Sequence, residues 1–178
     1  MRKALSGILL GVLALMFVVL TTGSSSATPV VTPTPTVVKV EITRINYNAN
    51  GADTLANRWK EGVYFKNVGT TDVNVTGWRV HDTYKNADDE YTNDFVIRKL
   101  NGNDVILQPG KSVLVTPASG TDHVTANGNT YVFYYNFTDK GYNGHVWNNI
   151  SDTVFLKNAS GVLVHRMSYS FENGYYVR

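Results

Sequence analysis

The chain offers few side chains whose type and spacing could carry out chemistry. It has no cysteine, which excludes disulfides, thiolate metal sites and cysteine nucleophiles. The four histidines, His81, His123, His145 and His165, show none of the short spacings that place two imidazoles on one metal ion. Gly-x-Ser-x-Gly, Walker and Gly-x-Gly-x-x-Gly sequences are also absent. We therefore expect no catalytic residue, no metal-binding residue and no cofactor.

One loop concentrates acidic side chains. Residues 82–94 contain five acids, and carboxylate oxygens in an extracellular protein can bind calcium. The loop lacks the central glycine and the late glutamate of an EF-hand. A solvated polar loop is the simpler interpretation, and calcium binding is the alternative.

Aromatic residues form the second unusual set, with 11 tyrosines against 7 phenylalanines. In a strand, Tyr131, Phe133 and Tyr135 would share one face, with Val132 and Tyr134 on the other. Half-exposed tyrosines can stack on sugars or contact a partner protein. Cross-strand pairing that only stabilises a sheet is the simpler alternative.

The elements that must position these side chains have the two-residue period of β-strands. Val38, Val40 and Ile42 alternate with polar residues, and the phase then slips by one, which predicts a β-bulge near Thr43–Arg44. Further strands are predicted at 63–65, 73–75, 78–80, 95–100, 112–116, 131–135, 153–157, 162–169 and 175–177. Asn-Gly, Pro-Gly and Ser-Gly turns separate many of them, and no helical pattern follows residue 36. We predict an all-β protein, an antiparallel β-sandwich.

The first 36 residues differ from the remainder. Residues 1–27 combine a basic start, an apolar run and a small-x-small site, which is typical of a secretory signal peptide. An uncleaved membrane anchor is the alternative. Residues 28–36 alternate proline and threonine and are typical of an extended linker. Residues 37–178 then form one domain, which we expect to be secreted or tethered at the cell surface.

The charge of this domain argues against nucleic-acid and anionic membrane partners. Removing Arg2 and Lys3 from the 16 basic residues leaves 14, which equals the 14 acidic residues. A neutral domain lacks the basic surface that phosphate backbones attract. We expect no nucleic-acid partner, and contact with a membrane only through a retained N-terminal segment.

Four segments of the chain carry motifs whose order and spacing match those of a known domain family. They are EGVYFKNVG at 61–69, VTGWRVHD at 75–82, LQPGKSVLVT at 107–116 and VWNNISDTVFL at 146–156. Together they resemble the lamin-tail domain, a family that implies an immunoglobulin-like β-sandwich. The resemblance covers residues 38–170 and departs from the family at Gly62, Tyr64 and Ser151, which replace an aromatic residue, an acid and a glycine. The last change puts serine where a positive φ is expected.

The residues that match the family motifs have structural interpretations. They are Asn67, Gly77, Trp78, Asp82, Trp147, Asn148, Asn149 and Asp152. We expect Trp78 to fill the space between two sheets and Asp82 to accept hydrogen bonds from amides of the next loop. Asn148, Asn149 and Asp152 are expected to form a turn that begins the strand Thr153–Lys157.

These observations favour a non-catalytic extracellular interaction or attachment module that binds a protein or a cell-envelope polymer. One alternative is a carbohydrate-binding module that uses exposed tyrosines. The other is a small secreted hydrolase, because a pair of catalytic carboxylates need not be close in sequence.

Overall fold

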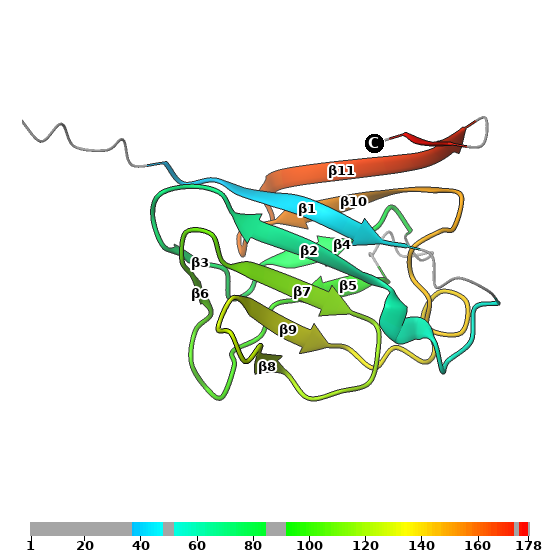
Figure 1. Cartoon of the computed structure of the whole chain (residues 1–178), viewed down its shortest axis with the longest axis horizontal. Helices are drawn as coiled ribbons and strands as arrows, with labels where there is room; N and C mark the ends of the chain where they lie inside the picture. The colour runs from blue at the N-terminus through cyan, green and yellow to red at the C-terminus, as the bar shows by residue number, and fades with distance from the viewer. Residues whose placement is uncertain (1–36, 48–51, 85–91, 173–174, 178) are drawn as a thin grey trace, which may run out of the picture. The chain divides into compact units, whose positions relative to one another are not determined.

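The alternating pattern of the sequence forms two β-sheets that pack face to face (Figure 1). The structure is a computed structural model that describes residues 37–47, 52–84, 92–172 and 175–177, all within one compact unit, Thr34–Arg178. The predicted signal peptide (1–27), the predicted linker (28–36) and residues 85–91 of the acidic loop lie outside the described residues. Within the described part, no helix has the length and hydrophobicity needed to cross a membrane.

Each sheet has five strands, and the predicted all-β sandwich is confirmed. The first contains, in spatial order, β1 (Val40–Asn46), β2 (Gly62–Asn67), β7 (Ser112–Thr116), β9 (Thr130–Tyr134) and β8 (His123–Val124). The second contains β12 (Tyr175–Val177), β11 (Leu163–Glu172), β10 (Ser151–Lys157), β4 (Arg79–His81) and β5 (Asp94–Val96). A small ribbon pairs β3 (Val73–Asn74) with β6 (Ile106–Leu107), and a 3-10 helix, η1 (Arg58–Lys60), precedes β2.

One strand pair differs from the antiparallel arrangement that the sequence predicts. Strands β7 and β9 run parallel, from the pair Ser112–Thr130 to the pair Thr116–Tyr134. A parallel pair needs a crossover of about a dozen residues. Residues 117–129 supply it, and they carry the short strand β8, which pairs antiparallel with the outer side of β9. The two-residue strands β6 and β8 were not predicted.

The predicted bulge in β1 is confirmed. Ile42 pairs with Phe65 and Arg44 pairs with Tyr64, so Thr43 is the extra residue. The bulge keeps Ile45, which packs against the core, on the same face as the buried Ile42. It also places the guanidinium of Arg44 3.8 Å from the centre of the Tyr64 ring, a cation–π contact at the position where the family pattern has an acid.

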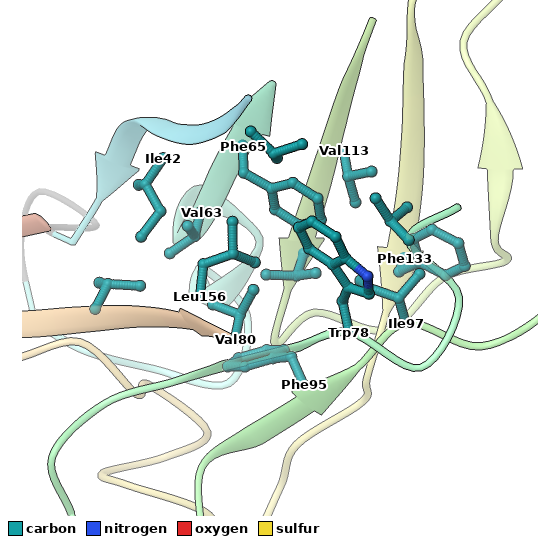
Figure 2. Close-up of a cluster of buried hydrophobic side chains, with 14 of the residues drawn as sticks. Ile42, Val63, Phe65, Trp78, Val80, Phe95, Ile97, Val113, Phe133 and Leu156 are labelled. Carbon is teal, nitrogen blue, oxygen red and sulfur yellow. The ribbon is translucent and has the colours of Figure 1, made fainter. Parts of the chain in front are cut away.

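The core lies between the sheets, and Trp78 is one of its two tryptophans. Figure 2 shows the Trp78 indole among Phe65, Ile97 and Phe133, which belong to the same buried cluster. The side chain is 8% exposed, which confirms the prediction that it fills the space between the sheets. Burial of an indole contributes several kcal/mol to folding because it removes a large apolar area from water.

Two glycines make this packing possible. Gly77 has φ +79°, in the left-handed region, and so turns the chain directly before Trp78. Gly62 allows a close approach of β2 and β7, because a Cβ there would lie 2.8 Å from the Val115 carbonyl oxygen. This contact explains why Gly62 stands where the family pattern has an aromatic residue.

Replacing Trp78 with alanine tests the role of the buried indole. We expect Trp78→Ala to lower the free energy of unfolding by about 3–5 kcal/mol, because it removes transfer energy and leaves a cavity. Trp59→Ala is the matched control, since Trp59 is 65% exposed and its loss should change stability by less than about 1 kcal/mol. Urea denaturation followed by circular dichroism measures both. Equal losses for the two variants would contradict the assigned core.

Candidate functional site

A polar pocket of about 590 Å³ is the candidate functional site. Three segments meet there: residue 53 before η1, the loop that follows β4, and the loop 138–150 between β9 and β10. Figure 1 shows η1 and the loop 138–150 at the same end of the sheets. Two of the lining side chains, Tyr84 and Tyr142, are 64% and 71% exposed. They are the most exposed tyrosines among the residues whose side chains the structure describes.

A tight turn positions one side of the pocket. Tyr142 and His145 exchange two backbone hydrogen bonds, with N–O distances of 3.1 and 2.9 Å. Between them, Asn143 and Gly144 both have positive φ, as the predicted Asn-Gly turn requires. The Asn143 side chain donates a hydrogen bond to the carbonyl of Asp53, at 3.0 Å, and thereby ties this turn to the segment before η1.

Behind the pocket, the turn places His145 beside two carboxylates, in what we call the Asp53–Glu61–His145 cluster. His145 Nδ1 lies 2.6 Å from Glu61 Oε1 and 3.8 Å from Asp53 Oδ1. Glu61 is 1% exposed and His145 is 4% exposed. The second Glu61 oxygen accepts a hydrogen bond from the amide of Val146 at 3.0 Å. Glu61 therefore anchors the loop 138–150 to the start of β2.

The hydrogen bonds determine where the protons of this cluster lie. His145 Nε2 faces two acceptors, the Thr54 carbonyl at 3.0 Å and Asn57 Oδ1 at 3.1 Å, so this nitrogen donates. A further hydrogen lies between Nδ1 and Glu61 Oε1. Burial raises the pKa of Glu61 to about 7, although the His145 contact opposes the rise. Burial of His145 lowers its pKa, because it disfavours the charged imidazolium. The hydrogen bonds to the Thr54 carbonyl and the Glu61 carboxylate have a larger combined effect, so the pKa of His145 is raised overall.

The cluster is not arranged as a nucleophilic triad. The described contacts of both ring nitrogens are carboxylate, carbonyl and amide oxygens, and none is a serine or threonine hydroxyl. A triad requires a hydroxyl within hydrogen-bond reach of the imidazole. The described contacts instead attach the loop 138–150 to the start of β2.

Of the motif residues, four line the pocket: Asp82, Trp147, Asn148 and Asn149. Asp82 Oδ1 accepts a hydrogen bond from the Tyr84 amide at 2.9 Å, which confirms the predicted capping, and Oδ2 accepts one from Asn93 at 2.6 Å. Burial raises the pKa of Asp82 to about 6, although both hydrogen bonds oppose the rise. Trp147 is 2% exposed and stacks on Phe95 with ring centres 5.7 Å apart.

Asn148, Asn149 and Asp152 form the other half of the motif set at the pocket end. Asp152 accepts hydrogen bonds from the amides of Asn148 and Thr153, at 3.2 and 2.7 Å, which confirms the side-chain-to-backbone turn. Asn149 departs from this prediction, because its side-chain nitrogen Nδ2 donates to Asp53 Oδ2 at 3.1 Å instead. Ser151 is the first residue of β10 and is not among the described residues with positive φ, so the predicted strain there is wrong.

The remaining motif residues lie away from the pocket. Asn67 is fully buried; its side chain donates to the carbonyls of Thr71 and Leu107, both at 2.7 Å, and accepts from the Gly69 amide. It closes the turn after β2 and attaches that turn to β6. Gly77 and Trp78 belong to the core described above.

Two sequence predictions about binding have different outcomes. Tyr131 and Tyr135 are half-buried, and their hydroxyls donate to backbone carbonyls of Ile106 and Val96, so this row of aromatic residues stabilises the fold.

In the acidic loop, Asp82 accepts hydrogen bonds from within the loop and Asp94 forms an ion pair with Arg79 at 2.6 Å. The three other acids lie outside the described residues, so calcium binding there stays a prediction.

Sequence reasoning missed the Asp53–Glu61–His145 cluster. Glu61 and His145 are 84 positions apart, and no short spacing connects them. The usable signal was the Asn143–Gly144 turn, which marks a sharp reversal but does not indicate what the next side chain contacts.

Changing Asp82 to asparagine tests the pH dependence of the pocket end. An unfolded aspartate titrates near pH 4 and the folded Asp82 near pH 6, so folding favours the protonated form. The stability that this group contributes is present below about pH 4 and is lost as the pH rises through about 6. Relative to wild type, Asp82→Asn should gain up to about 3 kcal/mol between pH 4 and 7. Urea denaturation at several pH values in that range measures the free energy of unfolding of both proteins. If the two free energies change with pH in parallel, the prediction is wrong.

Similarity to known proteins identifies the family to which the chain belongs. The family model described as Lamin Tail Domain matches residues 33–171 of the chain. No curated protein matches the sequence of the chain. The matched range includes every described strand from β1 to β10 and nearly all of β11. The chain belongs to the lamin tail domain family, whose members are immunoglobulin-like β-sandwich modules.

Proposed function

We propose that this domain is a non-catalytic extracellular attachment module and that the pocket at the loop 138–150 is its binding surface. The observation that carries the proposal is the pair of exposed rings, Tyr84 and Tyr142, on a pocket supported by the two sheets. An exposed aromatic ring gains free energy when a ligand covers it. The predicted signal peptide and linker support a role outside the cell.

The pocket is suited to binding because its walls are held in place. Asp82, Asn143 and Asn149 each hydrogen-bond to another pocket segment or within their own loop. Little conformational entropy is then lost when a ligand binds. Tyrosine adds to this advantage, since its ring presents a large area with only two side-chain torsions.

A sugar-containing polymer is the ligand class that these features favour over a protein. Aromatic rings can stack on the apolar faces of sugars, and charged and amide groups can bind the hydroxyls. The pocket supplies both kinds, with Asp139, Lys140 and Asn149 beside the two tyrosines. The net charge of zero, after removal of Arg2 and Lys3, gives little long-range attraction to a charged protein.

Affinity chromatography on immobilised peptidoglycan, chitin and cellulose tests the proposal by measuring retention of the protein. We expect retention by at least one of them, weakened about three- to tenfold in Tyr84→Ala and in Tyr142→Ala because each loses one stacking ring. Trp59→Ala removes an equally exposed ring outside the pocket and should leave retention unchanged.

Two outcomes would contradict the sugar assignment. The first is no retention on any polymer while the pocket variants lose capture of an envelope protein, which would make the ligand a protein. The second is equal loss in the Trp59 control, which would mean that the rings act non-specifically. Circular dichroism of each variant confirms that it is folded.

A further inference from the structure

We propose that Asp53, Glu61 and His145 bind a transition-metal dication of the Zn²⁺ type behind the pocket. Their three ligand atoms, Asp53 Oδ1, Glu61 Oε1 and His145 Nδ1, lie within 4.8 Å of one another. Among the described residues, this is the one group of three such side chains with that geometry. The inference does not depend on the attachment role, because metal binding and polymer binding can each occur without the other.

Each proposed ligand is oriented by a second contact on its other side. His145 Nε2 donates to the Thr54 carbonyl at 3.0 Å, which leaves Nδ1 facing the two carboxylates. This arrangement, with the far imidazole nitrogen on a backbone carbonyl, is the usual support of a metal-binding histidine. Glu61 Oε2 is held by the Val146 amide at 3.0 Å, which leaves Oε1 toward His145.

Asp53 supplies the independent observation that points to a ligand. Its Oδ2 accepts a hydrogen bond from Asn149 at 3.1 Å. Its Oδ1 is a buried atom without a hydrogen-bond partner in the described structure, and it lies 3.8 Å from His145 Nδ1. A buried carboxylate oxygen without a donor is costly, and a bound cation would remove that cost.

The distances require only a small adjustment for a metal ion. Ligand atoms about 2.0–2.1 Å from a tetrahedral Zn²⁺ lie roughly 3.3 Å from one another. The observed separations of His145 Nδ1 from the two carboxylates, 2.6 and 3.8 Å, lie on either side of that value. Movements of less than about 1 Å, together with release of the hydrogen between His145 Nδ1 and Glu61 Oε1, would therefore form the site.

The ligand set selects the class of ion, and the pocket provides access. One imidazole and two carboxylates suit Zn²⁺, Co²⁺ or Mn²⁺, whereas Ca²⁺ needs six to eight oxygen ligands. Asp53 and His145 line the pocket, so its solvent can reach the ion and complete its coordination.

Titration with Zn²⁺ and Co²⁺ tests the proposal on the purified full chain after treatment with a chelator. We expect one Zn²⁺ per chain by calorimetry, a higher unfolding temperature with Zn²⁺, and visible absorption bands with Co²⁺. Asp53→Asn and Asp53→Ala should each weaken binding at least tenfold. Asp53 is chosen because its side chain is 18% exposed, whereas Glu61 is buried and its replacement risks preventing folding.

His123→Gln is the control for adventitious binding by a surface histidine, because His123 is exposed on β8. We expect this variant to bind Zn²⁺ as wild type does. Absence of saturable one-to-one binding, or binding that survives both Asp53 changes, would overturn the proposal. The polymer-retention assay is run with a chelator throughout, so failure of the metal site and failure of the attachment role give separate results.

Discussion

The carboxylate of Glu61 is the constraint on which the pocket end of the molecule depends. It is buried where η1 leads into β2, and it contacts His145 and the Val146 amide. Burial of a carboxylate is unfavourable unless hydrogen bonds and a positive charge compensate it. The loop 138–150 supplies both, so the position of that loop follows from the requirement to satisfy one acidic side chain.

This constraint joins two regions of different physical character. Between the sheets, stability comes from apolar burial around Trp78, which is insensitive to the exact hydrogen-bond pattern. At the pocket end, Asp82, Asp152 and Glu61 are buried acids whose pKa values are raised by burial. Such groups reduce stability when they ionise, and buried titratable groups of this kind concentrate at binding sites. The same fold therefore combines an apolar core with a polar end that contains buried acids.

Much of the fold could be predicted because its signals are local. The alternation in β7 predicts Ser112–Thr116 correctly, and the phase slip after Ile42 predicts the bulge. The predicted strand 95–100 shortens to Asp94–Val96, since the chain then leaves the sheet for the loop before β6. The parallel pairing of β7 and β9 was not predictable, because both orientations have the same pattern of apolar residues.

The candidate site was less predictable than the fold. Motif residues such as Asp82 could be placed near a loop, but the exposed tyrosines could not be distinguished from the buried ones. Tyr135 and Tyr142 are both followed by asparagine, yet one packs against the core and the other is 71% exposed.

The sequence alone determined the class of this protein, a β-sandwich with a buried tryptophan after Gly77, because the alternation of apolar residues is a property of neighbours along the chain. Tertiary structure decided the pocket, the exposed rings and the Asp53–Glu61–His145 cluster. These features depend on side chains as far as 96 positions apart, and only the packing of loops against the sheets brings them together.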